Sequence, residues 1–136
     1  MSATKMNNGL DPLNQILLNK AAQANLVLHL FTNVVTPAVT DTTSTYTECS
    51  LSGYSSFTLT GSSWSTGASG GVDTATYPSL TTTFASYGGG TTIYGYYITV
   101  TISATTYLIA AQNFASSYAV PSGGGQLIVN LTETLQ

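Results

Sequence analysis

Most of the chain after Asn25 alternates its side-chain types at a period of two, which is the pattern of β-strands. In the first such stretch, 26–31, leucines occupy every second position, and Val27, His29 and Phe31 fill the others. Because both sets are largely apolar, we expect this strand to be buried on both faces. Further strand candidates follow at 46–51, 56–60, 80–87, 93–103, 106–114 and 126–135.

Breaks rich in glycine and serine separate these candidates and predict turns or loop tips at 66–71, 88–90 and 121–125. Seven short strands with this spacing predict an all-β fold, an antiparallel β-sandwich of jelly-roll-like or immunoglobulin-like kind. The single cysteine, Cys49, cannot form the inter-sheet disulfide of immunoglobulin domains, and Trp64 lies in a Gly/Ser-rich context. These two departures favour the jelly-roll-like sandwich.

One N-terminal segment has a helical period instead. Asp11 and Pro12 suit the N-cap and first position of a helix, and a stripe at helical spacing follows: Leu13, Ile16, Leu17, Ala21 and Ala24. We therefore predict one amphipathic α-helix over 12–24, packed over an end of its own domain or docked on a neighbouring subunit. The predicted organisation is a flexible arm over 1–10 and a single sandwich domain over 11–136 that includes the helix.

Charged residues are scarce, and this constrains the surface. They make up 5% of the chain, against about a quarter in a typical globular domain, while some 40 positions are Ser or Thr. Burying a hydroxyl with a partner costs much less than burying an ion, so this composition is typical of a surface that neighbouring proteins cover. The sequence predicts a structural, interaction-type protein.

The charge distribution also argues against nucleic acid as a partner. The net charge is −3, and the only cations are Lys5 and Lys20, too few to neutralise nucleic-acid phosphates. The chain has no apolar stretch of 18 residues, so we predict no membrane-spanning helix. Residues 1–9 lack the apolar run of a secretory signal, which predicts synthesis in a cytoplasm.

Reactive side chains are few, and none forms a catalytic or metal-binding motif. His29 and Cys49 are the only candidate base and nucleophile. Both fall in predicted strands, so we expect a hydrogen-bonded histidine and a buried thiol. No zinc-ligand spacing and no calcium loop occurs, and the glycine runs lack the lysine of a phosphate-binding loop. The sequence predicts no enzyme, no cofactor and no metal.

Four aromatic residues are candidates for contacts with other molecules: Trp64, Tyr94, Tyr96 and Tyr97. Strict alternation would place Tyr94 and Tyr96 on one face of a strand and Tyr97 on the other. An exposed cluster could stack sugars, as in a carbohydrate-binding module. Bulky residues on both faces are instead more typical of a core combined with an interface, so we expect these four residues to anchor a protein interface.

Several short motifs follow the predicted helix in a fixed order between residues 12 and 100. They are Leu28-His29-Leu30-Phe31-Thr32-Asn33, Thr36-Pro37, Tyr46-Thr47-Glu48, Gly53-Tyr54, Leu59-Thr60, Trp64, Ala75-Thr76-Tyr77 and Tyr94-Gly95-Tyr96-Tyr97. In this order the chain resembles small virion structural proteins of tailed bacteriophages, of the capsid decoration or cement type. The C-terminal third resembles them only in a Gly-rich loop and a final strand.

The resemblance implies a non-enzymatic protein on the outer surface of a capsid, made in the host cytoplasm and bound to the major capsid protein as an oligomer, a homotrimer. We hypothesise that the segment 2–24 is the capsid-contacting or subunit-exchanging element, because both cations lie there. Its candidate interface residues are Lys5, Leu13, Ile16, Leu17 and Lys20. The alternatives are another virion component, such as a tail, adaptor or head-fibre protein, and a carbohydrate-binding or adhesive module.

Overall fold

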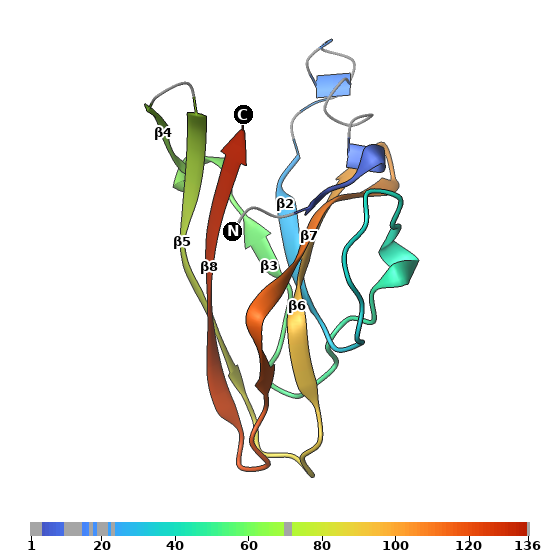
Figure 1. Ribbon diagram of the computed structural model, residues 1–136, viewed down its shortest axis with the longest axis vertical. Coiled ribbons are helices and arrows are strands. Elements are labelled where there is room, and N and C mark those ends of the chain that lie inside the picture. The colour runs from blue at the N-terminus through green and yellow to red at the C-terminus, as the bar shows by residue number, and fades with distance from the viewer. Residues whose placement is uncertain are drawn as a thin grey trace.

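The computed structural model describes residues 4–9, 15–16, 18, 22, 24–69 and 72–135. Within these residues the strands form two antiparallel sheets that face each other (Figure 1). The five-stranded sheet has the order β1-β7-β6-β2-β3 and the three-stranded sheet the order β4-β5-β8. The all-β, antiparallel prediction is confirmed. The strands are β1 (Thr4–Lys5), β2 (Leu26–Phe31), β3 (Phe57–Leu59), β4 (Ser65–Ser69), β5 (Val72–Phe84), β6 (Thr92–Ile102), β7 (Thr105–Ala119) and β8 (Gly125–Leu135); the 3₁₀ turns are η1 (Asn7–Gly9), η2 (Thr43–Thr45) and η3 (Gly61–Ser63).

The main core lies between the two sheets. Strand β2 contributes Leu28 and Leu30 from the large sheet, and β8 contributes Val129 and Leu131 from the small one. These side chains are buried because alternate positions of each strand point inward. Hydrophobic contact across this layer therefore holds the sheets together.

A second apolar cluster, which we call the outer cluster, covers the opposite face of the large sheet. Its buried residues are Met6, Phe31, Tyr46, Tyr97, Leu108 and Ala111. Phe31 and Tyr97 project from this face, and Tyr46 packs onto them from the β2–β3 connection. That connection runs along one side of the sheet in Figure 1. The predicted burial of strand 26–31 on both faces is confirmed in part. On the outer face, where a long loop acts as a third layer, Phe31 is buried, whereas Val27 and His29 are half-buried.

Strand β6 does not alternate regularly, which corrects the predicted side for one tyrosine. Ile93 and Tyr96 both reach the inter-sheet core, while Tyr94 and Tyr97 both pack in the outer cluster. The register between β6 and β7 shifts between Ile93 and Gly95, so a bulge changes the phase of the strand. The prediction that Tyr94 shares a face with Tyr96 is wrong for this reason.

Three strand boundaries also differ from the sequence prediction. The stretch 46–51 is not a strand, and its ladder pairing with β2 is limited to an isolated bridge between Phe31 and Glu48. The break predicted at 66–71 overlaps β4, and β5 begins well before residue 80. Side chains of β4 such as Ser65 and Thr66 are exposed, so backbone pairing with β5 forms this strand without an apolar alternation to reveal it.

The N-terminal predictions fall largely outside the described residues. Of the helix expected over 12–24, the structure describes only Gln15, Ile16, Leu18, Ala22 and Ala24, and the described residues contain no α-helix of that length. Within the segment expected to be a flexible arm, Thr4 and Lys5 pair with β7, and Met6 is buried in the outer cluster. This part of the N-terminus is therefore packed against the large sheet.

Candidate functional site

The predicted contact residues occupy different environments. Leu13, Leu17 and Lys20 lie outside the described residues, and Ile16 is half-buried. Lys5 forms an ion pair with Glu133.

The four aromatic residues are also separated. Tyr96 and Tyr97 are only 3% and 6% exposed, so their rings are part of the cores of this chain. Trp64 and Tyr94 are half-buried and retain some surface for contacts with other molecules.

Among the side chains that the structure describes, the outward face of the small sheet is exposed and carries no charge. We call its described exposed residues the hydroxyl face: Ser65, Thr74, Thr76, Ser79, Thr81, Thr83, Gln126, Ile128, Asn130 and Thr132. Cross-strand pairing aligns Thr76 with both Ser65 and Thr132, and Ser79 donates a hydrogen bond of 2.6 Å to Asn130. Ile128, 53% exposed, adds an apolar side chain to this face. The sheet places these residues on one surface because every second residue of a strand points the same way.

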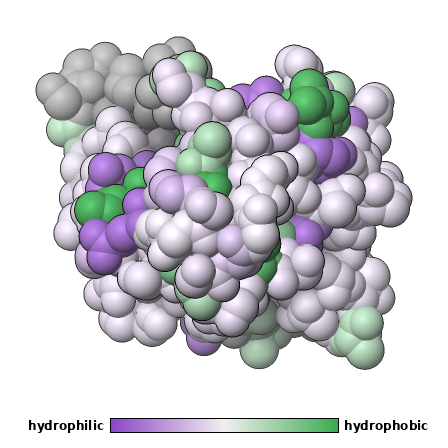
Figure 2. Space-filling model, turned by 90° about the horizontal axis from the view of Figure 1, so that it is seen from below, coloured by the Kyte–Doolittle hydropathy of each residue, from purple (hydrophilic) through white to green (hydrophobic). Residues whose placement is uncertain are grey.

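The end of the molecule with the 85–91 and 120–124 loops has a similar character. Figure 2 shows this end in mostly pale colours, which indicate intermediate hydropathy, with small separate green and purple patches. This end of the molecule is therefore neither strongly hydrophobic nor strongly hydrophilic.

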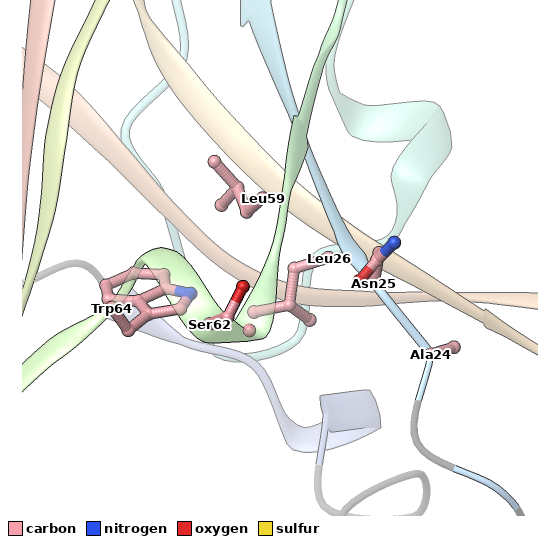
Figure 3. Close-up of a pocket in the computed structure, with 7 residues that line it drawn as sticks. Ala24, Asn25, Leu26, Leu59, Ser62 and Trp64 are labelled. Atoms are coloured by element: carbon pink, nitrogen blue, oxygen red, sulfur yellow. The ribbon is translucent and has the colours of Figure 1, made fainter.

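A pocket of about 620 Å³ opens beside Trp64. Figure 3 shows Trp64 and Ser62 on the η3 side of this pocket and Leu26 with Asn25 on the β2 side. The indole ring packs edge-on against Tyr77, with 5.1 Å between ring centroids. The pocket thus offers an aromatic ring, a hydroxyl and an amide to a neutral ligand. Its lining residues are Ala24, Asn25, Leu26, Leu59, Gly61, Ser62 and Trp64.

A polar network surrounds His29 on the outer face of the large sheet. Nδ1 of His29 lies 2.8 Å from Oε1 of Glu48, and Nε2 lies 3.0 Å from Oγ1 of Thr99. The imidazole also stacks on Tyr97, with 4.7 Å between ring centroids. These contacts confirm the predicted hydrogen-bonded histidine.

The order carboxylate, imidazole, hydroxyl has the connectivity of a nucleophilic triad, but only 5% of Thr99 is exposed. Thr99 is buried within β6, between β2 and β7. Cys49 lies in the inter-sheet core, on the other side of the sheet from His29, and burial raises the pKa of its thiol. The network therefore fastens the β2–β3 loop to the sheet.

Tyr54 connects this network to the backbone, and its hydroxyl gives a testable prediction. It accepts a hydrogen bond from the N–H of Leu30 and donates one to Oε1 of Glu48, each at 3.0 Å. Tyr54→Phe leaves the Leu30 N–H without this acceptor, so we expect a loss of about 1–3 kcal/mol of unfolding free energy. Urea denaturation measures the loss. The matched control is Tyr107→Phe, because that hydroxyl forms no hydrogen bond among the described residues; equal effects of the two substitutions would contradict the prediction.

Buried tyrosines also predict a loss of stability in alkali. Burial raises the pKa of Tyr96 and of Tyr97 to about 12 from the ordinary value of 10.0, and Glu48 contributes at Tyr97. Above pH 10 the unfolded chain loses these protons and the folded chain retains them, so each residue lowers stability by about 1.4 kcal/mol per pH unit up to pH 12. Urea denaturation at a series of pH values from about 9 to about 12 measures how the unfolding free energy falls with pH. We expect a smaller fall in Tyr97→Phe. A slope unchanged in Tyr97→Phe would refute the assignment.

Comparison with known proteins identifies no relative: no known protein family, curated protein or solved structure matches this chain. Among the described residues, no helix has the length and apolar composition required to cross a membrane. The same residues contain no group of three or more His, Cys, Asp or Glu side chains arranged to hold a metal ion.

Proposed function

We propose that this chain is a non-enzymatic structural protein that decorates and stabilises a phage capsid, binding the shell of major capsid protein as an oligomer. The observation that carries this proposal is the hydroxyl face, an exposed, charge-free surface on a sandwich whose other outer face is covered by its own loop. The motif order from residue 12 to 100, which resembles cement proteins, gives the class of partner.

The chemistry of the hydroxyl face suits permanent attachment to a protein surface. Thr, Ser, Asn and Gln form hydrogen bonds without the large desolvation cost of ions. Contacts between neutral groups also depend little on salt, whereas exposed ion pairs weaken as ionic strength rises. We therefore expect attachment to persist at high salt.

The finer features of the proposal remain predictions. They are the homotrimer, the jelly-roll-like topology, the helix over 12–24 and its role with Lys20 in contacting the shell. In the described part of the N-terminus, Lys5 already pairs with Glu133. Because Lys5 is engaged within its own chain, we propose that the apolar residues Leu13, Ile16 and Leu17 make the shell contact.

The decisive experiment places charge on the hydroxyl face. Thr76→Lys and Thr132→Lys are expected to weaken binding to undecorated capsid shells at least ~10-fold, because each buries an ammonium group without a partner. Thr58→Lys is the matched control, since Thr58 is an exposed threonine on β3 of the other sheet. Co-sedimentation with shells at low and at high salt measures binding. Full binding by folded Thr76→Lys and Thr132→Lys proteins would reject this face as the contact surface.

The contribution of the N-terminus needs a separate test. Deleting 1–24 would also remove β1 and the buried Met6, so substitutions within the predicted helix are cleaner. We expect Leu13→Asp with Leu17→Asp to weaken shell binding while the thermal midpoint stays unchanged. Unchanged binding would remove this segment from the interface.

The pocket beside Trp64 supports a second candidate function, a carbohydrate-binding or adhesive module. An aromatic ring beside neutral hydrogen-bonding groups fits a sugar, which has an apolar face and hydroxyls. Trp64 is the only tryptophan, so its fluorescence reports directly on occupancy. Saturable quenching or shielding by oligosaccharides, lost in Asn25→Ala and Ser62→Ala, would favour this function over capsid decoration.

A further inference from the structure

One ion pair joins the first strand to the last and the large sheet to the small one. Lys5 lies on β1, an edge strand of the large sheet, and Glu133 lies on β8, an edge strand of the small sheet. Nζ of Lys5 contacts Oε2 of Glu133. The pair therefore bridges the two layers of the sandwich at one side.

The surroundings of this pair are unfavourable for two ions. The Glu133 side chain is 15% exposed and that of Lys5 is 46% exposed. Apart from Lys5, neither carboxylate oxygen has a hydrogen-bond donor, although both oxygens are buried. A buried carboxylate normally accepts several hydrogen bonds, because desolvation of the ion is costly. Desolvation at this site therefore disfavours both charges and reduces the cost of transferring a proton from the ammonium group to the carboxylate.

The state of the lysine agrees with this geometry. Burial lowers the pKa of Lys5 below its ordinary value, which increases the fraction of neutral amine. A neutral amine is a nucleophile, and a positioned neighbour gains a large rate advantage because the two groups no longer have to meet by diffusion.

We propose that Lys5 and Glu133 form an intramolecular isopeptide bond. Proton transfer from the ammonium group to the carboxylate first gives the neutral pair. Nζ then attacks the side-chain carboxyl carbon of Glu133, a C–N bond forms, and the C–OH bond breaks. The hydroxyl leaves with a proton from the nitrogen as one molecule of water, so the products are an amide and water, and no oxidant or other co-reactant is consumed.

The bond gives the sandwich a covalent connection that its composition otherwise lacks. Cys49 is the only cysteine, so the chain has no intrachain disulfide. A Lys5–Glu133 amide closes almost the whole chain into one loop, and a cross-link across a long loop restricts the unfolded state most. It also prevents β1 and β8 from separating under load. This inference does not depend on the proposed capsid role.

Intact-mass spectrometry of the full-length, natively purified protein tests the bond directly. We expect a mass lower than that of the sequence by one water molecule. The chain has two lysines and no arginine, so trypsin would cut an unlinked, denatured chain into 1–5, 6–20 and 21–136. With the bond, Lys5 is blocked and trypsin cuts only after Lys20, which leaves 1–20 joined to 21–136 as one branched molecule.

Three variants separate the covalent bond from the ion pair. Lys5→Arg retains a cation beside Glu133 but cannot form this amide, so we expect the full sequence mass and a lower thermal midpoint. Glu133→Ala is expected to have the full mass as well. Lys20→Arg is the matched control, in which the loss of water should persist.

Each outcome decides the proposal. A wild-type protein with the full sequence mass overturns it, and so does a loss of water that persists in Lys5→Arg. A dehydrated protein that trypsin still separates into three peptides also overturns it, because the water was then lost elsewhere, for example at an aspartate. A branched tryptic product with its link at Lys5 and Glu133 establishes the bond.

Discussion

Replacing Gly95 by alanine is expected to abolish the stable fold, with a loss of more than about 3 kcal/mol of unfolding free energy. Gly95 lies on β6 opposite β7, next to the bulge. A Cβ atom there would lie 2.8 Å from Cα of Asn113 and closer still to the carbonyl oxygen of Gln112. Both neighbours are backbone atoms of a paired strand, so neither can move without breaking the ladder that supports the core.

Gly67→Ala is the matched control for this substitution. Gly67 also lies in a strand, the exposed β4, but a Cβ atom there meets no other atom within 4 Å. We expect a change within about 0.5 kcal/mol, as at most surface sites. Circular dichroism and thermal denaturation of both variants measure the difference. A Gly95→Ala protein as stable as Gly67→Ala would show that β6 and β7 do not approach this closely.

The second large effect is expected at Phe31, which is completely buried in the outer cluster. Its ring lies 5.0 Å from that of Tyr46, which the β2–β3 loop supplies. Phe31→Ala removes one of the contacts between this loop and the sheet and leaves a cavity, at an expected cost of about 3–5 kcal/mol. Equilibrium denaturation measures the cost.

Limited proteolysis provides a second measurement for Phe31→Ala. Because the loop loses an anchor, we expect cleavage within 32–56 before global unfolding. Val34→Ala is the control, since Val34 is three residues away and 81% exposed. A Phe31→Ala protein that matches this control in stability and in cleavage would disprove the role of the outer cluster.

The candidate contact surface was only partly accessible from the sequence. The shortage of charge predicts a neutral, hydroxyl-rich exterior, and the small sheet has such a face. The four aromatic interface candidates were selected by assuming strict alternation along the strand. Alternation does not reveal whether a distant loop buries an outward-facing side chain. Tyr97 is covered because Tyr46, distant in the sequence, stacks on its ring. The ion pair of Lys5 with Glu133 gave no local signal, because its partners are almost the full chain apart.

Local features could be predicted from consecutive residues: the alternation of 26–31, the long strands near 93–103 and 126–135, and the all-β class. The period of a strand is a property of its own backbone, so it can be read from consecutive residues. Tertiary structure alone decided the bulge at Gly95, the exposed strand β4 and the loop that forms a third layer. Each of these depends on pairing or packing with distant residues, and such contacts determine strand register and burial more strongly than intrinsic propensity does.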